Sequence, residues 1–199
     1  MSARSDILSA IRTQQAMSVP APPEYRAPTP ADLVQAFADR AQLASAEVRF
    51  IDSETDVPET IADLLRARNL PAVVHVPPSC TSLPWHTAPG LTIDVASPGP
   101  DDAAVAIAPF GIAETGTLAY PSQRDRPASW HFRAGFEIAI LRADAILPHI
   151  ENVIGCLKAS GLPSTINFVT GASRTGDIEQ TLELGAHGPK ALTILIIRA

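Results

Sequence analysis

The fold is constrained most by a series of short apolar segments that recur along most of the chain. Several of them are apolar at consecutive positions and do not alternate between apolar and polar residues, a pattern typical of strands that are covered on both faces. Parallel sheets, whose faces are covered by helices, contain strands of this kind. The candidate strands are residues 48–51, 72–76, 91–95, 103–109, 117–120, 136–141, 165–170 and 192–197.

Helical patterns alternate with these strands, which predicts an α/β domain with a largely parallel sheet, preceded by N-terminal helices. One helix is expected to begin at Pro30, with Thr29 as its N-cap and Asp32 in its first turn. The other predicted helices are residues 5–16, 58–68, 148–160 and 177–184.

The chain is expected to divide into an N-terminal helical arm, residues 1–44, and an α/β domain, residues 45–199. Within the arm, residues 18–30 form a strap with five prolines, a composition that favours extended polyproline-like chain. Two alternatives remain open for this strap: a flexible tether, or an arm docked on the same chain or on a neighbour.

Composition narrows the classes of partner. The 199 residues are 46% hydrophobic and 18% charged, as expected of a globular domain with a core of its own. The formal net charge of -6 argues against a nucleic-acid or polyanion surface. Small molecules or other proteins are therefore the expected partners.

The two cysteines, Cys80 and Cys156, lie far apart and outside any Cys-x-x-Cys spacing. The chain therefore shows no disulfide framework and no metal or iron–sulfur cradle of its own, and the histidines show no ligand spacing. We expect a reducing, cytosolic compartment. The N-terminus does not resemble a signal peptide, and no stretch approaches the roughly 20 apolar residues that span a bilayer.

The segment "AETGTL" at 113–118 is the first that has the residue types of a functional site. Glu114 is a candidate catalytic acid, base or nucleophile, Thr115 and Thr117 offer hydroxyls to a ligand, and Gly116 permits close backbone approach. The alternative is a polar hairpin, which the spacing alone favours because Gly and Thr are ordinary turn residues.

The second segment, "GASRTGDIE" at 171–179, carries glycines five apart but lacks the lysine and hydroxyl residue of a phosphate-binding P-loop. A turn that leads into a helix can still receive a carboxylate or phosphate at the helix N-terminus. The alternative, which the spacing alone favours, is that the acidic residues only cap their own helix. The candidate ligand-binding residues are Ser173, Arg174, Thr175, Asp177 and Glu179.

The third segment, "GAHGP" at 185–189, places His187 on a constrained loop before the last strand, with Gly188 beside it. His187 is a candidate for proton transfer or for donation to a substrate, and Gly188 for ligand binding. The alternative for a lone histidine is a structural hydrogen bond to the backbone. The chain has no G-x-S-x-G or G-x-G-x-x-G motif, which argues against a serine hydrolase or a Rossmann dehydrogenase.

A long polar insertion, residues 122–135, lies between two candidate strands and combines arginines with Trp130 and His131. Such a loop is a candidate lid or a docking surface for an acidic partner. Alternatively, Trp130 and Phe132 only anchor the loop to the core.

Taken together, "AETGTL", "SRTGDIE" and "GAHGP", in this order and separation, resemble the lactate-utilisation family of LutC or YkgG type, the LUD-domain proteins. The likeness covers roughly residues 45–199. It departs at Gly176, where the family usually has alanine, and at Glu137, near the place of a family histidine. The resemblance implies a fold like the NagB/RpiA/CoA-transferase group, and a site around the polar residues of the three segments.

The resemblance also implies membership in a three-part system that oxidises L-lactate to pyruvate. In this first hypothesis the chain is an accessory subunit that binds no cofactor, and the iron–sulfur clusters are on an iron–sulfur subunit and a cysteine-rich subunit. In the alternative the chain is an enzyme or sensor for a small anion such as a sugar phosphate, a CoA ester or a carboxylate. A third possibility is a purely structural role.

Overall fold

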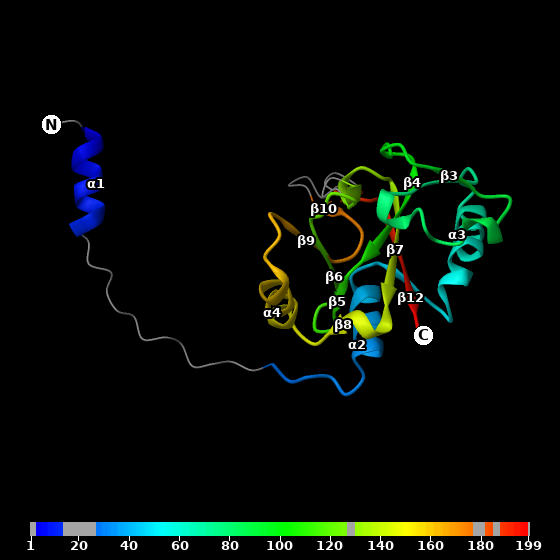
Figure 1. The fold of residues 1–199 in the computed structure, drawn as a ribbon, viewed down its shortest axis with the longest axis horizontal. Helices are drawn as coiled ribbons and strands as arrows, with labels where there is room; N and C mark the ends of the chain where they lie inside the picture. The colour runs from blue at the N-terminus through cyan, green and yellow to red at the C-terminus, as the bar shows by residue number, and fades with distance from the viewer. Residues whose placement is uncertain (1–2, 14–26, 127–129, 177–181, 185–187, 199) are drawn as a thin grey trace.

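A computed structural model describes residues 3–13, 27–126, 130–176, 182–184 and 188–198 of the chain. Its centre is a six-stranded sheet in which all neighbouring strands run parallel (Figure 1). The predicted α/β class with a largely parallel sheet is therefore confirmed. The strands, in spatial order, are β1 (Glu47–Ile51), β12 (Ala191–Ile197), β7 (Phe136–Arg142), β4 (Ala103–Ala108), β2 (Val73–His75) and β3 (Thr92–Asp94).

A second sheet of four strands lies against the first and is of mixed direction, because β6 runs antiparallel to β5 and β9 whereas β5 and β8 run parallel. The segments 117–120 and 165–170 thus form strands as predicted, but they belong to this second sheet. Two short strands, β5 and β8, and a separate hairpin of β10 and β11 were not predicted. These strands are β8 (Ile146–Leu147), β5 (Phe110–Ile112), β6 (Thr117–Pro121), β9 (Ile166–Val169), β10 (Arg174–Gly176) and β11 (Leu182–Leu184).

Helices complete the layers. α3 covers one face of the six-stranded sheet, α2 and the four-stranded sheet cover the other, and α4 packs on the outside of the four-stranded sheet (Figure 1). Among the described residues, no helix is long and apolar enough to cross a membrane. The α-helices are α1 (Ala3–Thr13), α2 (Leu33–Leu43), α3 (Val57–Ala67) and α4 (Ile150–Ser160), and the 3-10 turns are η1 (Glu54–Asp56), η2 (Pro78–Cys80), η3 (Trp85–Thr87), η4 (Trp130–Phe132) and η5 (Ala143–Ala145).

Burial follows the alternation of side chains along the central strands. On β7, Phe136, Ile138 and Ile140 point into the core under α3, whereas Ala139 and Leu141 point toward α2 and the second sheet. Full burial on both faces explains why this strand contains hydrophobic residues at consecutive positions.

Two predicted helix boundaries need correction. The helix expected to begin at Pro30 begins at Leu33, and its N-cap is Asp32, whose carboxylate accepts a 2.9 Å hydrogen bond from the Gln35 N–H. An aspartate caps at least as well as the threonine that was expected, Thr29, and it lies directly before the apolar face. The helix predicted over 177–184 is wrong at Leu182–Leu184, which form strand β11 paired antiparallel with β10; residues 177–181 lie outside the described part.

α1 stands apart from the layered body (Figure 1), and none of its residues is buried. Ile7 and Ile11, which are 60% and 62% exposed, form a narrow apolar stripe on this helix. Packing of α1 therefore adds nothing to the stability of the α/β body, and the apolar stripe of α1 is open to solvent.

Candidate functional site

The first motif forms the turn of a hairpin. β5 and β6 pair antiparallel, and residues 113–116 connect them. Gly116 has a φ of +66° and donates its N–H to the Ile112 carbonyl at 2.9 Å. A Cβ at this position would stand 2.2 Å from the backbone nitrogen of Ala41 in α2. The predicted polar hairpin is confirmed, and the glycine is needed because the turn contacts the backbone of α2 directly.

Threonine hydroxyls connect the first motif to the second. The hydroxyl oxygens of Thr115 and Thr117 lie 2.7 Å apart, and that of Thr117 lies 2.7 Å from the hydroxyl of Thr170. Thr170 directly precedes the glycine-containing segment that starts at Gly171. The pairing of β6 with β9 produces this contact across 53 positions of sequence.

Backbone contacts connect the second motif to the third. The Ser173 N–H donates to the Pro189 carbonyl at 2.9 Å, and a Cβ at Gly188 would stand 3.3 Å from the Cβ of Ser173. Gly171 has a φ of +74°, and a Cβ at this position would clash with the carbonyl oxygen of Ala44, just after α2. Thr117, Ser173 and Gly188 thus lie along one chain of contacts between the three motifs.

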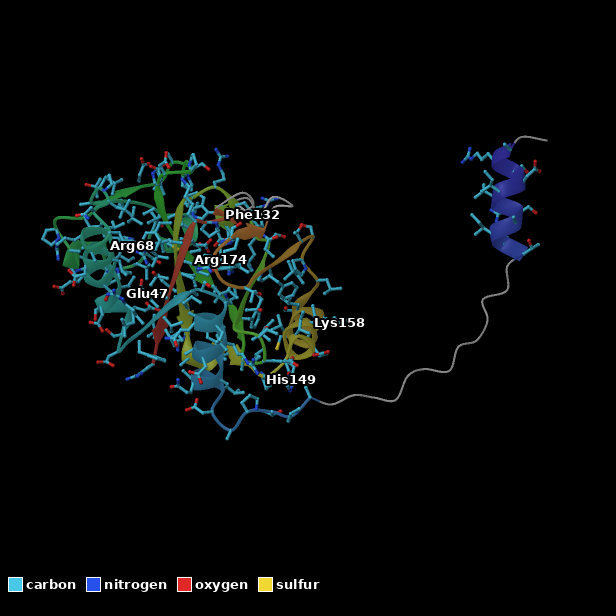
Figure 2. All side chains as sticks on the ribbon, turned by 180° about the vertical axis from the view of Figure 1, so that it is seen from behind. Glu47, Arg68, Phe132, His149, Lys158 and Arg174 are labelled. Atoms are coloured by element: carbon cyan, nitrogen blue, oxygen red, sulfur yellow. The ribbon has the colours of Figure 1, made fainter. Side chains whose placement is uncertain are left out.

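The remaining candidates of the second and third motifs are only partly described. Arg174, which is labelled in Figure 2, and Thr175 lie in β10, and Arg174 is exposed. Because β10 pairs with β11, the described residues on either side of 177–181 form a hairpin and not the predicted helix. Asp177, Glu179 and His187 lie outside the described residues.

Glu114 forms a pair with a histidine. Its carboxylate lies 3.2 Å from Nδ1 of His149, the N-cap residue of α4, and Figure 2 shows His149 well separated from Arg174. The side chains are 43% and 15% exposed, respectively. Among the described residues, Nε2 of His149 is buried and has no hydrogen-bond partner. This arrangement suits acid–base chemistry, because the carboxylate orients the imidazole.

An open groove of about 680 Å³ lies beside Glu114. One wall is formed by α2 and the other by residues 27–30. The last residues of the proline-rich strap therefore lie against their own chain, which agrees with the alternative of a docked arm. Residues 18–26 of the strap lie outside the described part. The groove is lined by Ala27, Pro28, Thr29, Pro30, Ala36, Asp39, Arg40, Leu43, Ala113 and Glu114.

The long insertion is anchored to the core by one of its two aromatic residues. Trp130 is buried and donates its indole N–H to the Val105 carbonyl at 3.0 Å. Phe132, which is labelled in Figure 2, is 52% exposed, so the proposed anchoring is right for the tryptophan and wrong for the phenylalanine. The difference arises because β4 presents small side chains to this loop, and Ala104 makes room for the indole.

The insertion also buries His131 against two other polar side chains, Tyr120 and Glu137. Burial, the charge of Glu137 and the hydrogen bond to it raise the pKa of Tyr120 well above its ordinary value, so the phenol stays protonated. Sequence reasoning missed this cluster. The available signal was a glutamate inside an otherwise apolar strand, "FEIAIL".

Metal ligands are scarce in the described part of the chain, which contains no group of three or more His, Cys, Asp or Glu side chains arranged around a common point. Cys80 is buried, and this burial raises the pKa of its thiol to about 11, whereas Cys156 is exposed. The two thiols do not form a common ligand set.

Comparison with known families adds to this geometry. Residues 101–197, which contain all three motifs, match the LUD domain family. The chain therefore carries a LUD domain over this segment. Similar proteins include lactate utilization protein C of Anoxybacillus flavithermus, 33% identical over 86 residues, covering 43% of this chain and 39% of that protein. YkgG of Escherichia coli is 28% identical over 162 residues, covering 79% of this LUD-domain chain and 70% of YkgG.

A solved structure supports the fold of this LUD-domain protein. The crystal structure of a DUF162 family protein from Deinococcus radiodurans matches with a TM-score of 0.61 at 20% identity, covering 84% of this chain and 97% of that one. The aligned segments span less than half of the length of two lactate utilization protein C relatives, 39% in Anoxybacillus flavithermus and 49% in Geobacillus thermodenitrificans.

Proposed function

We propose that this LUD-domain chain is an accessory subunit of a system that oxidises L-lactate to pyruvate. One observation carries the proposal: the segment that matches the LUD domain contains all three motifs, and the same chain aligns with several proteins named lactate utilization protein C. In this proposal an iron–sulfur subunit and a cysteine-rich subunit carry the electrons, and this chain binds neither cluster.

The cysteines of the chain support this division of labour. Iron–sulfur clusters are held by cysteine thiolates, commonly four. The chain has two cysteines, and Cys80 is buried with the pKa of its thiol raised to about 11, so thiolate formation at this position is disfavoured. A cluster held by this chain would need ligands that its cysteines do not supply.

Two surfaces fit docking to such partners. α1 leaves the apolar side chains of Ile7 and Ile11 open, as expected of a helix that buries them in an assembly. The groove at the strap is lined by apolar side chains, by Asp39 and Arg40, and by Glu114, whose carboxylate pairs with His149. We propose that α1 docks on a partner subunit and that the pair contributes to the function of the assembled system.

Deletion of the gene in its host tests the proposal. The deletion strain, in a background without another lactate dehydrogenase, should not grow on L-lactate as sole carbon source, and the wild-type gene should restore growth. Affinity-tagged protein should also co-purify with the iron–sulfur subunit, and removal of residues 1–26 should weaken that association. Undiminished growth of the deletion strain on L-lactate would refute the proposal.

The contribution of the Glu114–His149 pair is tested by Glu114→Gln in the same complementation assay. We expect slower growth on L-lactate at unchanged protein level and unchanged melting temperature, because the exposed carboxyl adds little to stability. Glu151→Gln is the matched control, since Glu151 is an exposed carboxylate two residues beyond His149 in α4. Equal growth of both variants would exclude a role for Glu114.

A second candidate is an enzyme or sensor for a small anion. It is favoured by the path of hydroxyls from Thr115 to Thr170 next to the motif that begins at Gly171. A thermal-shift panel of carboxylates, sugar phosphates, CoA esters and nucleotides distinguishes the two, because a ligand at a hundredfold excess over its Kd stabilises the protein by about 2.7 kcal/mol. A stabilising compound, combined with normal growth of the deletion strain, would favour the sensor or enzyme.

A further inference from the structure

The six-stranded sheet ends on one side in β1, which leaves one edge of this strand open. In the described part of the chain, β12 is the only strand that pairs with β1. The pairing is regular from Glu47–Thr193 to Ile51–Ile197 and contains no bulge. β1 has five residues, whereas the other edge strands of the two layered sheets, β3, β8 and β9, have three, two and four. An open strand edge of this kind is a template for pairing with another chain.

The backbone groups of Val48 and Phe50 face this open edge. Along a strand, the N–H and C=O groups of alternate residues point to the same neighbouring strand. The N–H of Arg198, directly after β12, donates to the Ile51 carbonyl at 3.0 Å, so the odd-numbered residues of β1 bond within the sheet. The backbone groups of Val48 and Phe50 therefore point the other way and are available to a second strand.

The side chains of β1 carry opposite charges at alternate positions. Val48 and Phe50 pack on the face toward α2, so Glu47 and Arg49 lie on the face toward α3. These two charged side chains are 35% and 40% exposed, and Glu47 is labelled in Figure 2. Nε of Arg49 donates to the carboxylate of Glu47 at 2.7 Å. A guanidinium has five N–H donors, so this bond leaves donors of Arg49 for another carboxylate.

Charged side chains usually protect an edge strand, because like charges that face each other across two strands repel. β1 is complementary to itself in one arrangement. If two copies run antiparallel with Val48 opposite Val48, Glu47 of each copy faces Arg49 of the other. The register with Arg49 opposite Arg49 brings like charges together, and so does the parallel arrangement with Glu47 opposite Glu47. Opposite charges therefore meet in a single antiparallel register.

The same register satisfies the outward backbone groups. The N–H of each Val48 would donate to the Val48 carbonyl of the other copy, as in the hydrogen-bonded pairs of an antiparallel ladder. The N–H of Phe50 would donate to the Ala46 carbonyl of the other copy. The N–H of Ala46 already donates to the Ala41 carbonyl at 3.0 Å in the turn after α2, so it needs no partner across the interface. Backbone and side chains therefore select the same register.

We propose that this chain forms a symmetric dimer in which β1 pairs antiparallel with β1 of a second copy. The two six-stranded sheets join into one continuous sheet, and the twofold axis passes beside Val48. Because the same edge is used by both copies, the contact is isologous and assembly stops at two chains. The far edge of each sheet is β3, and edge strands as short as its three residues resist further pairing. The dimer goes beyond the proposed function, since it requires no partner subunit and no ligand.

Sedimentation velocity of the full chain tests the dimer. The mass should rise from 21.0 kDa toward twice that value as the concentration rises, with a dissociation constant on the order of micromolar, since a single strand pair makes a small interface.

Hydrogen exchange followed by NMR locates the interface. At a concentration ten times the dissociation constant, the Val48 amide should exchange about tenfold more slowly than in the monomer. Ile93 is the internal control at the opposite edge. The N–H of its neighbour Thr92 donates to the Ala72 carbonyl of the preceding strand segment, so the N–H of Ile93 faces outward and its exchange should not depend on concentration.

Charge variants assign the register. Arg49→Glu places carboxylates opposite each other and should weaken the dimer at least about tenfold, and Glu47→Lys should do so with facing cations. A mixture of the two variants restores opposite charges at both contacts, so a heterodimer should form with about the affinity of the wild type. Arg66→Glu is the matched control, because Arg66 forms an exposed ion pair with Asp63 on α3, and this variant should dimerise as wild type.

The mixture separates the interface from effects within one chain. Arg49→Glu and Glu47→Lys both break the ion pair between these residues in their own chain, and mixing does not repair that loss. Recovery of the dimer in the mixture therefore reports only the contact between copies. Circular dichroism of each variant verifies that it is folded.

Three results would overturn the proposal. The first is a mass that stays at 21.0 kDa at all concentrations. The second is a dimer that Arg49→Glu does not weaken, or that the mixture of variants does not restore. The third is protection of the Val48 amide only after addition of the iron–sulfur subunit, which would assign this edge to that subunit. The proposed function is read from growth on L-lactate, so its failure is distinguishable from failure of the dimer.

Discussion

Replacement of Gly116 by alanine tests the contact between the first motif and α2. The new Cβ would stand 2.2 Å from the backbone nitrogen of Ala41 and 2.6 Å from the carbonyl carbon of Arg40, so the helix or the turn must move. The φ of +66° adds strain of about 1–2 kcal/mol for an L-residue, and overpacking typically adds about 1–3 kcal/mol. We expect a total loss of about 2–5 kcal/mol in the free energy of unfolding.

The measurement is thermal unfolding followed by circular dichroism. For a chain of this size, 1 kcal/mol corresponds to about 2–4 °C, so Gly116→Ala should lower the melting temperature by at least about 4 °C. Gly155→Ala is the matched control. Gly155 lies inside α4, a Cβ there would meet no atom within 4 Å, and alanine stabilises an exposed helix position by about 0.5–1 kcal/mol. The reasoning is refuted if the two substitutions shift the melting temperature in the same direction.

Three further predictions concern ion pairing, thiol reactivity and the N-terminal helix. Partial burial raises the pKa of Glu47, but hydrogen bonds and ion pairs with Arg49 and Arg68 outweigh it and hold the pKa below 4.5 (Figure 2 labels Glu47 and Arg68). Glu47→Gln should therefore cost about 0.5–1 kcal/mol at neutral pH, and this difference, measured by urea unfolding, should shrink as the pH falls below 4.5 through the folded-state pKa. At pH 8, the exposed Cys156 should react quickly with a disulfide reagent such as DTNB, whereas the buried Cys80 should react only after unfolding. A fast reaction phase that persists in Cys156→Ser would contradict the burial of Cys80. Removal of residues 2–13 should shift the melting temperature by less than about 1 °C, because α1 buries none of its residues, and a larger loss would mean that α1 docks on its own chain.

The sequence predicts the central layers well because their signal is local. Consecutive apolar residues identify β4, β7 and β12, and Gly161, the C-cap of α4 with a φ of +100°, ends that helix where its pattern stops. The short strands β5 and β8 are different. With three and two residues they carry too little pattern of their own, and their pairing depends on neighbours that are distant in sequence.

The site is predicted in part for the same reason. Turn residues such as Gly116 are visible in the sequence, and the order of the motifs suggests that they converge. The partner of Glu114 is not visible, because His149 lies 35 positions away and no local spacing connects the two. The cluster of Tyr120, His131 and Glu137 is equally hidden, since these side chains meet only when the insertion folds back over the alanines of β4.

The order of strands in the six-stranded sheet has a consequence for how the protein folds and can be divided. The segment that matches the LUD domain starts at residue 101, yet β1 pairs with β12, and β2 pairs with β4. Expressed alone, residues 101–197 would expose one edge of β12 and one edge of β4, each a template for pairing with another chain. Long-range parallel pairing such as that of β1 with β12 also requires most of the chain to be synthesised before the sheet closes. The sheet therefore cannot be completed until β1 and β12 are both available for pairing, and a fragment cut at residue 101, where the matched segment starts, should aggregate.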